Sequence, residues 1–226
     1  MARATSKNRP EALEAADWAA ATEQQVLDQA LKLVPHDGWT SRMAKLAGKA
    51  AGLSEGETEL LLPQGPADLA ALLSRRHDAK ALEALAALDP ASLKIRERIA
   101  RGVAARIEAA MADEAAVRRL NGWFSLPPHM ALGGRLTWET ADKLWRWAGD
   151  TATDENHYSK RVLLAGILSG ALAIRLSSGP EAAKTFTDRR IENVMAFEKW
   201  KATTKLRPQD MIGRFAEALG RRRYGA

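Results

Sequence analysis

The chain has 226 residues and a formal net charge of +6, from 34 Lys and Arg against 28 Asp and Glu. This length suits one large domain or a small module joined to a larger one, and it is ample to bury a core. The chain has no cysteine, which excludes disulfides, thiolate catalysis and thiolate metal sites and suits a reducing compartment. The basic balance is equally compatible with an anionic partner, either nucleic acid or a membrane, and with an ordinary basic surface.

Helical periodicity dominates the chain, while alternating strand patterns with hairpin turns are missing, so we expect an all-α fold. Residues 1–20 contain no apolar run of the secretory type and are predicted to form a flexible tail. Helices are then expected over residues 22–34, 40–51 and 54–63. The first should stop at Pro35. Ser54 and Glu57 have the spacing of a capping box that starts the third.

The helices expected from residue 67 onward form a second, larger set. They cover residues 67–87, 91–111, 138–149, 154–176 and 180–203. Within this set, residues 121–134 are rich in Gly and Pro, and we expect them to break the helical pattern as an apolar loop that packs inward. Gly149-Asp150 marks a helix stop and a turn, after which Asp154 is the expected N-cap of the next helix.

Residues 144–161, LWRWAGDTATDENHYSKR, place aromatic, acidic and basic side chains beside the most apolar helix of the chain. Loops held by rigid helices are favoured places for recognition, so this motif is the first candidate functional site. Trp145 and Trp147 point in different directions around their helix. We expect Trp147 in the core. Trp145 either packs in the core or lies exposed beside Arg146, a pairing that suits a protein–protein contact.

The apolar run from Val162 to Ile174 is shorter than the roughly 20 apolar residues needed to span a bilayer. On a helical wheel, its small residues gather on one side and its bulky residues on the other. The small side permits close helix approach. The bulky side either fills an ordinary core or lines an apolar cavity, and the residues alone leave both possibilities open.

No arrangement in the sequence indicates an enzyme. Asp150, Asp154, Glu155 and His157 lie close along the chain, but a di-iron site in a helical bundle needs Glu-x-x-His pairs, which this sequence lacks. Nucleophile triads, Gly-rich phosphate loops and dinucleotide fingerprints are also missing. We therefore expect no catalytic residue, no metal and no cofactor.

Residues 207–226 predict an amphipathic helix with a basic end, joined to the body by a hinge at 202–206. Its apolar face carries Met211, Ile212, Phe215 and Leu219, and its cations are Arg214, Arg221, Arg222 and Arg223. Such a helix can rest in a bilayer interface near anionic lipid, or it can dock on its own domain.

Residues 26–39, followed by residues 47–73, resemble the DNA-binding half of TetR-type regulators, in which a helix-turn-helix pair follows a Gly-aromatic turn. By itself this resemblance implies a ligand-responsive repressor. The helix expected to enter the major groove opens with Glu55, Glu57 and Glu59, however, and DNA phosphates would repel these acids. The remaining candidates for phosphate contacts share one side of the preceding helix and are Arg42, Lys45 and Lys49.

The second half carries a more specific resemblance. The segments DKLWRWAGD (142–150), TD (153–154) and NHYSKR (156–161) closely resemble the hallmark of the TetR-fold accessory proteins of ubiquinone biosynthesis. Agreement with the family's last long helix continues at Phe186, Arg190-Ile191 and Val194-Met195. The chain differs from the family at Arg146, which is usually Tyr, and at His157 and Lys184, which are usually Trp.

This resemblance implies a homodimer with a vestigial helix-turn-helix module over 21–66, a lipid-binding and dimerisation domain over 67–203 and a membrane-binding helix over 207–226. The family's function implies a non-catalytic protein that takes an isoprenoid quinone precursor or phospholipid from the membrane. It would present the quinone precursor to the di-iron demethoxyubiquinone hydroxylase. The implied location is cytoplasmic and peripheral on the inner membrane, as in a bacterial-type cell, and no DNA partner is expected.

The resemblance also assigns candidate residues to three groups. The lipid-binding group is Trp123, Leu126, Met130, Trp138, Leu144, Trp147, Leu163, Leu164, Ile167, Leu168, Leu172 and Met195. The partner surface is Trp145, Arg146, Asp150, Tyr158 and Arg161. The membrane group is the set of apolar and basic residues named above for 207–226. We expect the lipid pocket behind Trp123, Leu163 and Ile167, and the handover at Trp145.

Overall fold

The structure, a computed structural model, describes residues 9–151 and 155–204. Over these ranges it is helical and contains no strand, which confirms the all-α prediction. An N-terminal module comprises α1 (Arg9–Asp37), α2 (Ser41–Ala50) and α3 (Glu55–Leu61). The larger body comprises α4 (Pro66–Leu85), α5 (Ile95–Met111), α6 (Glu114–Phe124), α7 (Pro127–Trp147), α8 (Glu155–Ser178) and α9 (Pro180–Thr204), with a short 3-10 turn, η2, at Pro90–Ser92.

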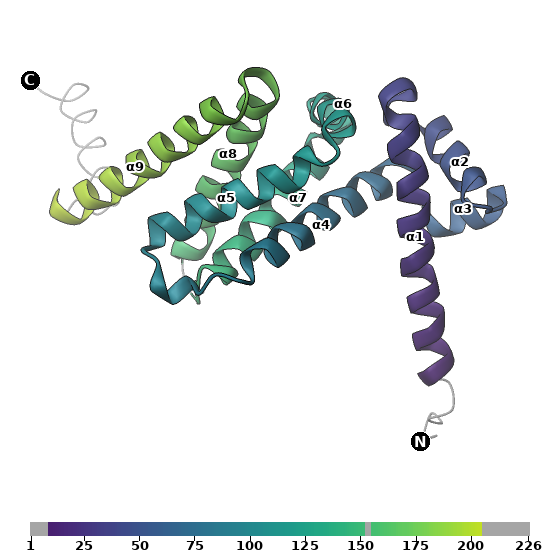
Figure 1. Ribbon diagram of the computed structural model, residues 1–226, viewed down its shortest axis with the longest axis horizontal. Coiled ribbons are helices and arrows are strands. Elements are labelled where there is room, and N and C mark those ends of the chain that lie inside the picture. The colour runs from purple at the N-terminus through teal and green to yellow at the C-terminus, as the bar shows by residue number, and fades with distance from the viewer. Residues whose placement is uncertain (1–8, 152–154, 205–226) are drawn as a thin grey trace, which may run out of the picture.

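In the N-terminal module α2 packs against both α1 and α3, while the N-terminal half of α1 projects away from the body (Figure 1). Its core is a continuous apolar cluster that includes Val26, Trp39 and Met43. Trp39 is 3% exposed, and its Nε1 donates to the carbonyl oxygen of Ala116 on α6 at 3.3 Å. This contact ties the module to the body.

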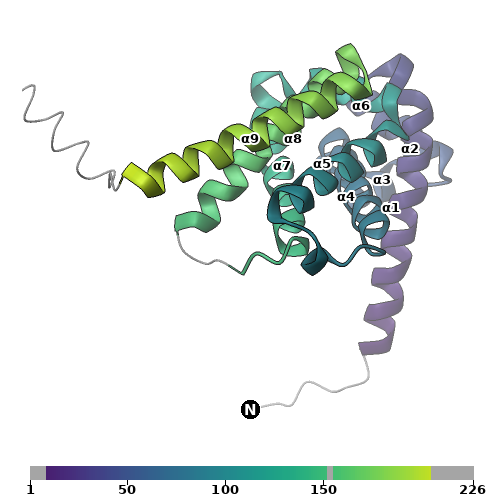
Figure 2. The same cartoon turned by 60° about the vertical axis from the view of Figure 1, so that its left-hand side comes forward.

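The body has a second apolar core, formed by α4, α5, α7, α8 and α9. Ile99 and Val103 of α5 meet Leu144 of α7, and Leu164 and Leu168 of α8 complete the cluster. Full burial of each such side chain contributes about 1.5–3 kcal/mol. The helix α4 contributes to both cores, and α9 lies alongside α8 (Figure 2).

Two predictions about the first helix are wrong. The predicted tail over 1–20 is helical from Arg9, because its Ala- and Glu-rich sequence has high helix propensity and Pro10 is tolerated in a first turn. The helix also continues past Pro35 to Asp37. It closes on Gly38, which has a positive φ of 66°, and Gly38 N donates to Val34 O at 2.9 Å.

The predicted loop over 121–134 is also wrong, because only Ser125 and Leu126 separate α6 from α7. Two prolines, Pro127 and Pro128, occupy the first turn of α7, where their missing N–H groups cost little. A Cβ on Gly133 would lie 3.0 Å from Cγ of Phe124, so this glycine allows the two helices to approach closely. Residues 114–120 of α6 were assigned to no predicted helix. The boundaries of the other helices lie close to those predicted, and the capping box of Ser54 and Glu57 is confirmed. The predicted N-cap Asp154 and the predicted helix over 207–226 lie outside the described residues.

By length and composition, the stretch His157–Ser178 of α8 would be long enough to cross a membrane, with a mean hydropathy of 1.4. The apolar run from Val162 to Ile174 is shorter than this stretch, because Arg161 and Arg175 bound it. In the structure α8 packs against α5, α7 and α9. It carries a buried arginine, Arg161, whose charge is paired by acids. We therefore treat α8 as a packed helix of the body.

Gly48→Ala should destabilise the N-terminal module. A Cβ at Gly48 would lie 2.2 Å from Oγ1 of the buried Thr58, so α2 and α3 must separate. The expected loss in the free energy of unfolding is about 1–3 kcal/mol, measured by urea denaturation. Gly56→Ala is the matched control, because nothing lies within 4 Å of its added Cβ. It should be neutral or stabilise by up to about 1 kcal/mol, and equal effects of the two variants would contradict the packing described.

Candidate functional site

A cavity of about 580 Å³ lies between α4, α5, α6, α7 and α8, within the range of small-molecule sites. Its rim is exposed, and its floor is buried. The rim residues are Asn121, Ser125, Met130, Gly134, Gly166 and Ser169. The apolar floor residues are Ile107, Ala110, Val117, Leu120 and Leu136. The small side of α8, with Gly166 and Ser169, thus borders the cavity together with Leu168 and Leu172.

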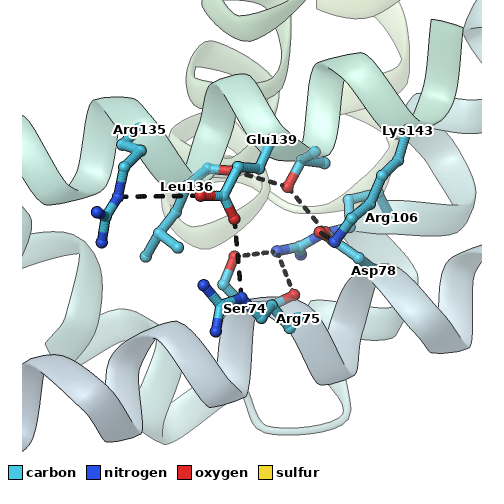
Figure 3. Close-up of polar contacts among 9 residues, drawn as sticks. Ser74, Arg75, Asp78, Arg106, Arg135, Leu136, Glu139 and Lys143 are labelled. Atoms are coloured by element: carbon cyan, nitrogen blue, oxygen red, sulfur yellow. Dashed lines mark hydrogen bonds and ion pairs between the residues drawn. The ribbon is translucent and has the colours of Figure 1, made fainter. Parts of the chain in front are cut away.

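A buried carboxylate, Asp78 of α4, pairs with lining residues of this cavity and joins three helices (Figure 3). Arg106 of α5 donates from Nε to Oδ1 at 2.7 Å, and Thr140 of α7 donates to the same oxygen at 2.8 Å. Lys143 Nζ donates to Oδ2 at 2.7 Å. Nη2 of Arg106 donates to Ser74 Oγ at 3.3 Å. Because a buried charge is tolerated only when paired, Asp78 fixes α4, α5 and α7 against one another.

His77, next to Asp78, also lines the cavity and is 2% exposed. Its pKa is lowered to about 4, mainly by burial and also by the nearby positive charge of Arg106, although the hydrogen bond to Asp113 acts in the opposite direction. His77 is therefore neutral at pH 7. Its Nε2 lies 2.8 Å from Oδ2 of Asp113. Since the carboxylate only accepts, Nε2 carries the proton and Nδ1 is an acceptor.

Three residues of the predicted lipid-binding group line this cavity: Met130, Leu168 and Leu172. Four others belong to the core of the body, namely Leu144, Trp147, Leu164 and Ile167. Three are exposed and lie away from the cavity lining, namely Leu126, Leu163 and Met195. The structure does not gather Trp123, Leu163 and Ile167 around one pocket, because Trp123 packs against the N-terminal core and stacks on His129. Lipid contact by these residues stays a prediction.

A second cavity, of about 480 Å³, lies between α5, α8 and α9. Its lining includes several charged side chains, among them Arg101, Glu108, Arg175 and Lys184, and none of the predicted lipid-binding residues. The cavity beneath α6 and α7 is the better candidate for an apolar ligand, because its charged floor groups are paired and apolar side chains surround them.

The motif over 144–161 is held by a second buried ion-pair network. Arg161 of α8 is 1% exposed, and its Nε donates to Asp142 Oδ1 on α7 at 2.6 Å. Its Nη1 donates to Asp150 Oδ2 at 3.1 Å. Lys160 Nζ donates to the other oxygen of Asp150 at 2.7 Å. This network, which we call the Arg161 network, holds the start of α8 against the end of α7.

The carboxyls of Asp142 and Asp150 have pKa values below the ordinary value near 3.8. Burial alone would raise both values, but hydrogen bonds and positive charge from their basic partners outweigh it. For Asp142 these partners are Arg161 and Arg146, and for Asp150 they are Lys160 and Arg161. Both acids are therefore ionised at pH 7, and the network consists of charged groups.

Within the predicted partner surface, two placements are wrong. Arg161 is buried, and the Asp150 side chain is only 6% exposed, so both lie beneath the surface because their charges pair with each other. Trp145 is half-buried, and its Nε1 donates to the carbonyl oxygen of Lys160 at 3.1 Å. Arg146 and Tyr158 remain exposed, and Tyr158 stacks on Trp138 with ring centroids 6.1 Å apart.

The sequence reasoning missed the polar floor of the cavity. Ser74, His77 and Asp78 occupy the positions of α4 that continue its buried face between Leu73 and Ala81. Polar residues at core positions of an amphipathic helix need partners, and their presence on the buried face of α4 was the sequence signal that could have revealed the polar floor.

In the N-terminal module, Lys45 forms ion pairs with Glu55 and Glu59, the latter at 3.3 Å, instead of offering a free cation to phosphate. The predicted membrane group lies outside the described residues.

Asp150→Asn should destabilise the body by about 3–5 kcal/mol at pH 7, because it leaves Arg161 buried with only one of its two carboxylates. Urea denaturation followed by circular dichroism gives this value. Asp188→Asn is the matched control, since its pair with Lys184 is largely exposed and should be worth less than about 1 kcal/mol. Similar small losses in both variants would show that the Arg161 network contributes little to stability.

Acid should weaken the fold through His77. Its folded pKa of about 4 lies below the ordinary 6.5, so the unfolded chain binds a proton first as the pH falls. The stability from this group is complete above about pH 6.5 and declines to about pH 4, by about 3 kcal/mol in total. His77→Gln should remove this part of the pH dependence. If wild type and variant show the same slope of unfolding free energy between those pH values, the burial described for His77 is contradicted.

Comparisons with known proteins match the region that carries the motif. The sequence model of the COQ9 family matches residues 130–198, which span most of α7, α8 and most of α9. Over 182 residues the chain is 25% identical to the mitochondrial ubiquinone biosynthesis protein COQ9 of Rattus norvegicus, covering 76% of this chain and 58% of that protein. It is 28% identical over 188 residues to COQ9-A of Xenopus laevis, covering 76% of this chain and 57% of that protein. The chain thus spans less than two thirds of the length of either relative. By these matches the chain is similar to ubiquinone biosynthesis proteins of the COQ9 family, most specifically over residues 130–198.

Proposed function

We propose that the chain is a non-catalytic, lipid-binding accessory protein of ubiquinone biosynthesis. It takes an isoprenoid quinone precursor from the membrane and presents it to the di-iron demethoxyubiquinone hydroxylase. The observation that carries the proposal is the cavity of about 580 Å³, whose walls are apolar and whose rim lies on α6, α7 and α8. The similar proteins of rat and Xenopus are named for ubiquinone biosynthesis, which supports the choice of ligand.

Handover would take place at the exposed face beside the Arg161 network. Tyr158, near the start of α8, is 64% exposed there. Arg146, in the last turn of α7, also has most of its side chain accessible. Tyrosine and arginine are enriched where proteins bind one another. The network beneath holds α7 and α8 in register, so it would position this surface without contacting the partner itself.

The proposed protein is a homodimer that works peripherally at the cytoplasmic side of an inner membrane. Exposed apolar side chains on α8 and α9, namely Val162, Leu163 and Met195, offer a surface for the second copy. The net positive charge of +6 suits an anionic bilayer.

Ser169→Trp should reduce lipid binding, because Ser169 lies on the cavity rim and an indole there occupies the entrance. After incubation with vesicles containing ubiquinone and gel filtration, the quinone retained per protein should fall by about tenfold, equivalent to roughly 1.4 kcal/mol. Ser177→Trp is the matched control, at an exposed position of the same helix outside the cavity lining. Equal retention by wild type and both variants would place any bound lipid elsewhere.

A further inference from the structure

The cavity floor offers polar atoms that the fold itself does not use. Arg106 employs Nε and Nη2 in its bonds to Asp78 and Ser74, whereas Nη1 has no hydrogen-bond partner within the described part of the chain. Nδ1 of His77 likewise has none among the residues described, because its ring pairs with Asp113 through Nε2 alone. Ser74 Oγ accepts from Arg106, so its own proton is available. All three residues line the cavity.

These groups form a preorganised cluster, because each is held by a hydrogen bond to a residue outside its own helix. Asp78 orients the guanidinium of Arg106 at 2.7 Å, and Asp113 orients the His77 ring at 2.8 Å. His77 is 2% exposed, and the Arg106 side chain is 12% exposed. A ligand that binds here meets donors and an acceptor already in place, and ordering them costs little.

The hydrogen-bonded and ion-paired charges of the floor balance. Arg106 and Lys143 carry two positive charges, and Asp78 and Asp113 carry two negative charges, while His77 is neutral at pH 7. Lys80, an exposed cation of α4, acts on His77 without belonging to these pairs. Outside this cluster, Arg75 and Arg135 lie near Glu139 on the solvent side, at 3.8 and 3.9 Å (Figure 3). A floor with hydrogen-bonding capacity and no net charge suits an uncharged oxygen-bearing group better than a carboxylate or phosphate.

We propose that Ser74, His77 and Arg106 bind the uncharged, oxygen-bearing head of an apolar ligand, namely a phenol or quinone ring. Arg106 Nη1 and the Ser74 hydroxyl donate to the ring oxygen, and His77 Nδ1 accepts from a phenol O–H. The tail lies along the apolar wall toward Met130 and Leu172 on α7 and α8. This inference rests on the proposed lipid-binding function and adds specificity-determining residues to it.

A site built to hydrogen-bond an oxygen discriminates against a ligand that lacks it, because its buried polar groups are then left unpaired. The test uses 4-octylphenol and octylbenzene, two probes that differ by one hydroxyl. Each partitions from phosphatidylcholine vesicles into the full-length protein and is quantified by extraction and mass spectrometry, with correction for its vesicle content. Wild type should prefer the phenol by about tenfold.

Two variants remove the preference without emptying the cavity. His77→Gln keeps a donor near the position of Nε2 for Asp113 and leaves no acceptor at the position of Nδ1, because the amide oxygen of glutamine lies on the same terminal carbon as its nitrogen. Ser74→Ala removes the hydroxyl. Each should bring the phenol-to-hydrocarbon ratio toward one while octylbenzene binding is unchanged. His36→Gln, the same change at an exposed residue of α1, should leave the ratio at the wild-type value. Thermal unfolding is measured for each variant as the control that its fold is retained.

The remaining outcomes overturn the inference in distinguishable ways. A wild-type ratio near one, or an unchanged ratio in both variants, overturns head recognition while lipid binding stands. Tighter binding of 4-octylbenzoate than of the phenol overturns the uncharged head and assigns the floor to an anion. If wild type binds neither probe, the proposed lipid-binding function fails, and this inference fails with it.

Discussion

The pairing of the buried Asp78 carboxylate is the interaction on which the arrangement of the body depends. A carboxylate in a helical interior is stable only when its charge and lone pairs are satisfied, and here α5 supplies Arg106 while α7 supplies Thr140 and Lys143. These bonds allow only one register of α4, α5 and α7. The same register places Ser74 and His77 on the cavity floor. The residues around Asp78 thus hold three helices together and also supply the polar groups at the floor of the cavity.

The Arg161 network applies the same principle one helix further on. Its charges join Asp142 of α7, and Asp150 just beyond the end of α7, to Arg161 of α8. Both α7, through Thr140, and α8 also line the cavity. The surface around Tyr158 and the cavity are therefore built on the same two packed helices. This connection gives a physical route by which partner binding and ligand release would be coupled in the proposed handover.

Much of the helical framework follows from the sequence, whereas the details of the site do not. The capping box of Ser54 and Glu57 has a local cause and was predictable. The breaks expected at Pro35 and over 121–134 were wrong. Proline is tolerated in the first turn of α7 and near the end of α1, and Gly133 allows α6 and α7 to approach closely, whereas both residue types are unfavourable in a helix interior. Arg161 was placed at the surface because charge favours solvent, and only the partners contributed by α7 reverse that expectation. The residues of the cavity floor come from four helices, α4 to α7, so their convergence depends on tertiary packing.

Native mass spectrometry of the purified protein, followed by organic extraction and identification of the released molecules, is the decisive measurement for the proposed binding of an isoprenoid lipid in the cavity bordered by α6, α7 and α8. We expect a dimer that retains an isoprenoid quinone or a related lipid and loses it on extraction. A lipid-free protein, purified from cells that make such lipids and unable to take them up from vesicles, would rule out this function and make the apolar side of α8 an ordinary core face.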